Sequence, residues 1–76
     1  MDWAHAISRP AAGPYKRCWV DVPGGQYVVW QNDPAPGTFR VWFTPEGKPE
    51  VFLGEVGNLR EALLLAERDA AWKLKR

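Results

Sequence analysis

Residues 39–53 have the sequence FRVWFTPEGKPEVFL, which predicts a β-hairpin with two different faces. If Thr44 pairs with Lys48 across a three-residue loop, Gly47 takes the left-handed position that such loops favour. One face is then purely apolar, and we expect it to join the core. The expected pairs are Phe39 with Leu53 and Val41 with Val51 on that face, and Arg40 with Phe52 and Trp42 with Glu50 on the other.

A second hairpin precedes this one. Residues 15–22 alternate between side chains of two kinds, as a half-buried strand does. The Gly24-Gly25 pair then predicts a tight turn, since both central positions of such a turn need φ > 0. The expected cross-strand pairs are Val22 with Tyr27, Val20 with Val29 and Trp19 with Trp30. Residues 32–38 are rich in Pro, Gly and Asp, so we expect a loop that joins the hairpins into a four-stranded meander.

A predicted helix follows Asn58. Asn is a strong N-cap, and Glu61 three residues later completes a pattern like a capping box. The fold class that we expect is α+β: a four-stranded antiparallel sheet of two hairpins, with one C-terminal helix packed on one face. Apolar residues at helical spacing would form the buried stripe of that helix, namely Leu59, Ala62, Leu63, Ala66, Ala70 and Leu74.

The chain divides into two parts. Residues 1–14 show no period of 2 or 3.6, which predicts a flexible N-terminal arm. The arm is either mobile or docked through Trp3 and Ile7. Residues 15–76 then form a single ββββα domain.

Composition excludes several classes of protein. One cysteine, Cys18, and one histidine, His5, leave no internal disulfide and no zinc site of the usual kinds. The longest apolar run, residues 62–66, is far too short to cross a membrane. The N-terminus lacks the basic and apolar regions of a signal peptide, so we expect a cytoplasmic protein with no membrane partner. The net charge of +1 is unlike that of strongly basic nucleic-acid binders.

Catalysis is not expected, because no nucleophile stands beside a base and no carboxylates form a spaced pair. Ser8 lies in the arm, Thr44 lies at a turn, and Cys18 is expected to face the core. Gly24-Gly25 leads into a strand, so this pair is not a phosphate cradle at a helix N-terminus. We therefore expect no catalytic residues, no metal and no small-molecule cofactor.

The sheet face away from the helix is the predicted binding surface. An uncovered face rich in tryptophan exceeds what an ordinary monomer exposes. Either the arm or a second copy of the chain covers it, or a protein binds it, or nucleic acid binds it. The residues expected there are Arg17, Trp19, Trp30, Arg40, Trp42 and Phe52.

The C-terminal segment resembles a DNA-binding family. The runs VFLGEVGNLREA at 51–62 and AERDAAWKL at 66–74 are similar to the last strand and helix of the plant ethylene-response-factor (APETALA-type) domain. Relatives of that domain include the N-terminal arm-binding domain of phage tyrosine integrases. In that family the sheet enters the major groove with Arg and Trp side chains. The resemblance implies that DNA is contacted by Arg17, Trp19, Arg40 and Trp42.

We therefore expect a small non-enzymatic binding module. Because of the resemblance, we slightly favour nucleic acid over protein as its target. The near-equal alternative is a protein-binding regulator or inhibitor, such as a phage-type accessory protein that docks on a larger host protein. Near-neutral charge and aromatic density favour this alternative. A homodimer that uses the same face is the third possibility.

Overall fold

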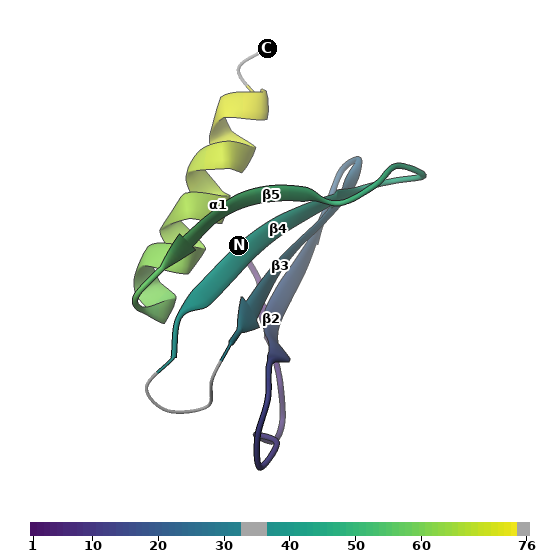
Figure 1. Ribbon diagram of the computed structural model, residues 1–76. Coiled ribbons are helices and arrows are strands. Elements are labelled where there is room, and N and C mark those ends of the chain that lie inside the picture. Colours follow the sequence, from purple (N-terminus) through teal and green to yellow (C-terminus); the bar gives the residue numbers. More distant parts are fainter. Residues whose placement is uncertain (33–36, 75–76) are drawn as a thin grey trace.

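The computed structural model describes residues 1–32 and 37–74, which form one five-stranded antiparallel sheet and one helix (Figure 1). The strands follow one another across the sheet in chain order, and the helix packs on one face. The α+β class is therefore confirmed. The elements are β1 (Ala4–His5), β2 (Tyr15–Val22), β3 (Gly25–Gln31), β4 (Phe39–Pro45), β5 (Val51–Val56) and α1 (Leu59–Leu74). Most of the loop predicted at 32–38, and the last two residues of the predicted domain, lie outside the described residues.

The expected count of four strands is wrong, because residues 1–14 contribute β1. Ala4 lies opposite Trp19 and His5 opposite Cys18, so β1 pairs with the edge of β2. The Ala6 N–H extends this pairing by donating to the Arg17 carbonyl oxygen at 3.0 Å. A strand of two residues places one side chain on each face, so no alternating pattern in the sequence reveals it.

The first hairpin turns one position earlier than expected. Gly24 has φ 89° and follows Pro23, which is the signature of a type II turn, while Gly25 already belongs to β3. The observed pairs are Val22 with Gly25, Val20 with Tyr27 and Trp19 with Val28. The expected pairs were therefore wrong by two residues. A slip of two leaves the side chains on their expected faces, because the strand period is two, except where a bulge between Lys16 and Cys18 interrupts β2.

The second hairpin has a longer loop than expected. Gly47 does adopt the left-handed conformation, with φ 70°. However, β4 ends at Pro45 and β5 begins only at Val51, after Pro49, whose missing N–H cannot join the ladder. The expected register is wrong, and a bulge near Leu53 shifts it once more. The observed pairs are Phe43 with Val51, Trp42 with Phe52, Val41 with Gly54, Arg40 with Glu55 and Phe39 with Val56.

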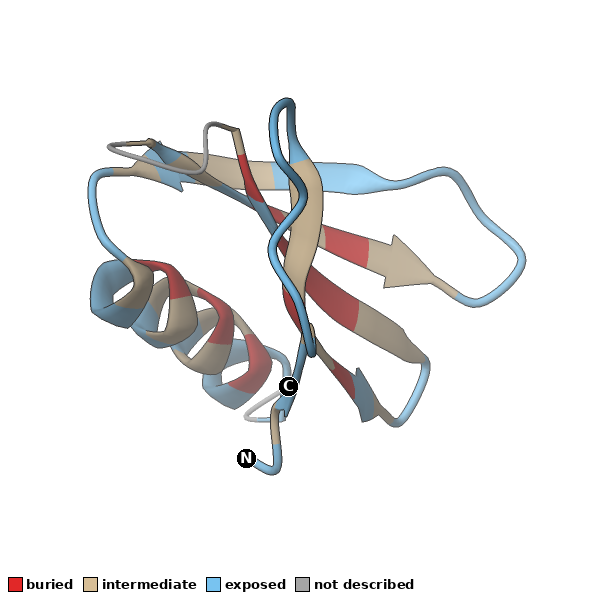
Figure 2. Ribbon diagram, turned by 90° about the horizontal axis from the view of Figure 1, so that it is seen from below, coloured by how far each residue is buried: buried red, intermediate tan, exposed pale blue. Residues whose placement is uncertain are grey.

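Helix α1 begins at the expected N-cap. The Glu61 N–H donates to Asn58 Oδ1 at 2.9 Å, which satisfies one of the free amides of the first turn. Small side chains let α1 lie close to the sheet, and its red buried stripe faces the strands in Figure 2. The core residues are Cys18, Val20, Tyr27, Val29, Val41, Phe43, Ala62, Ala66 and Ala70.

Two polar links tie α1 to the sheet side of the core. The Trp3 indole packs against the core and donates its Nε1–H to Glu67 Oε2 at 3.2 Å. The fully buried Tyr27 donates its hydroxyl to Asp69 Oδ2 at 2.6 Å. Lys73 Nζ lies 2.8 Å from the same oxygen and 3.3 Å from the ring centroid of Phe43. The last turns of α1 are therefore held by hydrogen bonds as well as by apolar contact.

This network changes the pKa of both acidic groups. Burial raises the pKa of Tyr27, and the hydrogen bond to Asp69 raises it further. For Asp69, burial acts to raise the pKa, but hydrogen bonds from Lys73 and Tyr27 outweigh it and hold the pKa below its usual range. Ionised Asp69 is therefore the form that the folded state prefers.

We expect Asp69 to make stability depend on acid pH. Its folded pKa lies below the unfolded value of about 3.9, so its contribution is complete above that value and disappears as pH falls through the folded pKa. Urea unfolding of the wild type and of Asp69→Asn at neutral pH and at a series of pH values below about 4 measures this. The free energy of unfolding of the wild type should exceed that of the variant at neutral pH, and this difference should disappear in acid. A difference that does not change with pH would contradict the lowered pKa of Asp69.

Candidate functional site

The sheet face away from α1 carries two adjacent rows of side chains that run across the strands. The first, here called the aromatic row, consists of Trp19, Val28, Trp42 and Phe52, which lie opposite one another on β2 to β5. The second, here called the charged row, consists of Lys16, Trp30, Arg40 and Glu55 in the same strand order. Together the rows are called the open face.

The aromatic row packs on itself. Trp42 and Phe52 lie with ring centroids 5.0 Å apart and planes tilted by 58°, a favourable aromatic arrangement. Val28 is 6% exposed although it faces away from α1, and its cross-strand neighbours are the indoles of Trp19 and Trp42. We attribute its burial to these two large side chains. The row is therefore a preformed surface, because its small central residue is already shielded.

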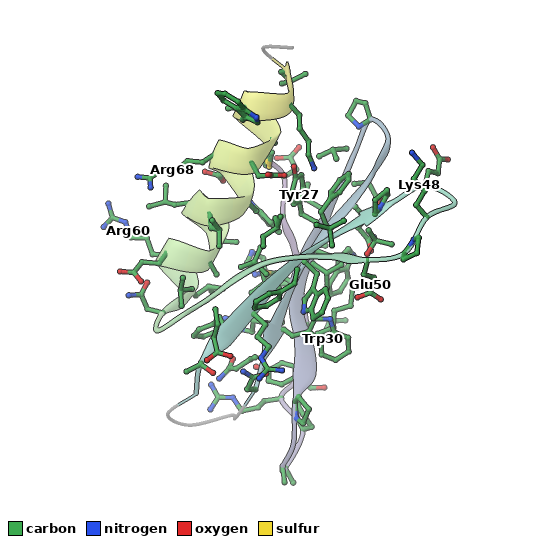
Figure 3. All side chains as sticks on the ribbon, turned by 45° about the horizontal axis from the view of Figure 1, so that its top comes forward. Tyr27, Trp30, Lys48, Glu50, Arg60 and Arg68 are labelled. Atoms are coloured by element: carbon green, nitrogen blue, oxygen red, sulfur yellow. The ribbon has the colours of Figure 1, made fainter. Side chains whose placement is uncertain are left out.

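Two aromatic side chains stay accessible on this surface. Phe52 is 50% exposed and Trp30 is 36% exposed. Trp30 lines a shallow groove together with Arg40, Trp42 and Glu50, and Figure 3 shows Trp30 and Glu50 on the side of the sheet away from α1. Ordered apolar area of this kind is available to a partner without prior rearrangement of the fold.

The charges of the open face are largely balanced. Arg40 Nε lies 2.8 Å from Glu55 Oε1, with both side chains about half exposed. Lys16 Nζ sits 4.8 Å from the ring centroid of Trp19, within the range of a cation–π contact. Glu50 brings a further carboxylate to the groove beside Trp30. The open face and its groove therefore carry two cations and two carboxylates, of which Arg40 and Glu55 form an ion pair, and the face has little excess positive charge.

Five of the six predicted binding residues lie together on the open face, namely Trp19, Trp30, Arg40, Trp42 and Phe52. Arg17 departs from them, because a bulge between Lys16 and Cys18 interrupts the alternation of β2. Its Nη1 lies 3.4 Å from Nδ1 of His5, which pairs with the inward-facing Cys18. Lys16 takes its place opposite Trp30. Of residues 1–14, Trp3 packs on the α1 side and Pro14 lines the groove beside Trp30.

Sequence reasoning missed Lys16 and Glu55 as members of this site. No residue of β2 is a glycine or proline that would mark the bulge, so strict alternation placed Arg17 there instead. Glu55 reaches Arg40 only because the second hairpin has the longer loop and the bulge near Leu53. Both omissions therefore come from register, which the sequence pattern specifies weakly.

The chemistry of the described residues offers little beyond binding. Cys18 is fully buried, and burial raises its pKa to about 11 against a smaller lowering effect of Arg17, so the thiol stays protonated at neutral pH. Residues 1–32 and 37–74 hold no group of three or more His, Cys, Asp or Glu side chains placed to bind a metal ion. In the same residues, no helix has the length and apolar character needed to span a membrane.

Comparisons with protein-family models, with curated proteins and with solved structures found no match to this chain. The resemblance to the ethylene-response-factor domain therefore stays a prediction from residues 51–62 and 66–74.

Proposed function

We propose that this chain is a non-enzymatic binding module whose open face recognises another protein. The observation that carries the proposal is the aromatic row, ordered and partly exposed, beside an arginine that is already paired. Tryptophan and arginine are the residue types that dominate binding energy at protein interfaces. The row crosses four strands, about 14 Å at the usual strand spacing, which suits an apolar segment of a partner.

Charge decides the order of the two candidate targets. Affinity for duplex DNA comes mostly from cations that neutralise phosphates. On the open face Arg40 is paired with Glu55, and Glu50 lies nearby, so phosphate would compete with carboxylates for the same guanidinium. We therefore place a protein target ahead of nucleic acid, in the role of a regulator or inhibitor that docks on a larger protein.

Single-stranded nucleic acid is the second candidate, because of two specific features. Trp30 and Phe52 present ring area on an antiparallel sheet, which is how several modules stack unpaired bases. Lys16 lies in the same charged row as Trp30. Such binding should weaken steeply with salt, whereas an apolar protein contact should not.

The protein target is tested by site-directed photo-crosslinking. A benzophenone amino acid replaces Trp30 on the open face, and in a matched control it replaces the exposed Lys48 in the β4–β5 loop. In extract of the source cells, we expect one protein to crosslink from position 30 and not from position 48. The same pattern from both positions, or no protein adduct from position 30, would contradict the proposal.

Nucleic acid and self-association are tested on the purified chain. Labelled single strands and duplexes are titrated at about 50 and 200 mM salt, where a phosphate-driven complex loses much of its affinity. Absence of binding at the lower salt removes the nucleic-acid candidate. Sedimentation at high concentration tests the homodimer: a monomer excludes it, and a dimer that Trp42→Ala dissolves would place the second copy on the open face.

A further inference from the structure

The outer face of α1 carries a second surface, on the side of the molecule opposite the open face. Two acidic side chains of α1 are engaged toward the sheet, since Glu67 accepts from Trp3 and Asp69 accepts from Tyr27. Two arginines, Arg60 and Arg68, point away from the sheet on one side of the helix (Figure 3). Of the three carboxylates of α1, Glu67 and Asp69 are therefore bonded toward the sheet and Glu61 stays exposed, while both guanidinium groups point outward.

The two arginines have no ion pair with any carboxylate of the described residues, where the pairs are Arg40 with Glu55 and Lys73 with Asp69. Both are exposed, and they lie eight residues apart, about 12 Å along a helix that rises 1.5 Å per residue. Two unpaired cations at a fixed spacing on a rigid element favour an anionic partner of matching spacing.

An apolar side chain lies between the arginines. Leu64 is four residues from each of them, and it is 39% exposed. It lines a shallow groove of about 410 Å³ with Val56, Leu65, Arg68 and Glu61, the last being the one carboxylate there. The surface is therefore a cation, an apolar contact and a second cation in line, here called the α1 stripe (Arg60, Leu64 and Arg68).

We propose that the α1 stripe docks an acidic helical segment of a protein, with an apolar residue flanked four positions away on each side by a carboxylate. Such a segment, laid along α1, sets its carboxylates against Arg60 and Arg68 and its apolar residue on Leu64. Carboxylates bind arginine in a two-pronged geometry that suits both guanidinium groups.

Other anionic partners fit the stripe less well. A nucleic-acid backbone has no apolar group to place on the leucine between the arginines. One leucine that is 39% exposed offers too little apolar area to enter a membrane. Because the stripe and the open face lie on opposite sides of the sheet, the chain could hold two partners at once. This proposal does not depend on what the open face binds.

A synthetic helical peptide with the pattern Glu-x-x-x-Leu-x-x-x-Glu tests it, beside a scrambled peptide of the same composition. Titration of the isotope-labelled chain, followed by amide NMR, should shift signals of residues 60–72 and leave β2 to β4 unchanged. The double variant Arg60→Glu/Arg68→Glu should weaken binding at least about tenfold. The matched control Arg9→Glu/Lys48→Glu, which changes the charge equally at exposed sites, should keep wild-type affinity.

The outcomes against the proposal are distinct. Equal loss in both double variants, or equal affinity for the scrambled peptide, would show attraction by net charge alone. If no NMR signal changes at about 1 mM peptide, the dissociation constant is well above about 1 mM, and docking of such a segment on the α1 stripe is excluded. Tighter binding to duplex DNA or to vesicles of phosphatidylserine and phosphatidylcholine, lost in Arg60→Glu/Arg68→Glu, would assign the stripe to those partners instead. Unchanged circular dichroism of both double variants is required for each comparison.

Discussion

Replacement of Gly25 by alanine is expected to lower the free energy of unfolding by about 3 kcal/mol, a large share of what a small domain has. A Cβ at this position would overlap the carbonyl oxygen of Thr44 and lie 2.8 Å from Cζ of Phe43. Thr44 belongs to the neighbouring strand, so its backbone cannot move without disturbing the pairing of β3 with β4. The melting temperature should fall by roughly 12–24 °C.

Thermal unfolding followed by circular dichroism measures this effect. The matched control is Gly57→Ala, because a Cβ on Gly57 has no atom within 4 Å and Gly57 has no positive φ. That control should stay within about 0.5 kcal/mol of the wild type. Similar melting temperatures for the two variants would mean that β3 and β4 do not approach each other as closely at Gly25 as the structure has them.

Replacement of Trp42 by alanine is expected to weaken binding of the open-face partner by about 30-fold, which corresponds to about 2 kcal/mol. Trp42 lies at the centre of the aromatic row, between Val28 and Phe52. Its loss removes a large contact area and uncovers Val28, so the variant should also lose some stability. Affinity must therefore be measured well below its melting temperature.

Fluorescence anisotropy with the protein that crosslinks from position 30 gives the affinity. Trp72→Ala is the matched control, since Trp72 is 60% exposed on α1 and lies outside the open face. Only the Trp42 variant should bind weakly. Equal affinities for the wild type and Trp42→Ala, with both proteins folded, would show that the aromatic row does not contribute to binding.

The faces of the sheet and the identity of the helix could be predicted from the sequence, because both rest on periodicity. A strand alternates every residue, so even a hairpin register wrong by two residues left Trp19, Trp42 and Phe52 on the correct face. The N-cap of α1 was also found correctly, since Asn58 binds the Glu61 amide through its side chain.

Cross-strand neighbours could not be predicted in the same way. They depend on loop length and on bulges. No glycine or proline marks the bulge at Arg17 in β2, and in β5 the mark is a single glycine, Gly54, beside the extra residue Leu53. This is why the Arg40–Glu55 pair, which reduces the positive charge of the site, was not foreseen. The electrostatic balance of a sheet surface is a property of register more than of composition.

The claim that the open face is the binding surface is tested most directly by the five indole N–H signals in the NMR spectrum of the chain. The protein that crosslinks from position 30 is added, and the signals of Trp19, Trp30 and Trp42 should shift together. Those of Trp3, which is bonded to Glu67, and of Trp72 on α1 should stay in place. Shifts at Trp3 or Trp72 with the three open-face signals unchanged would contradict the account.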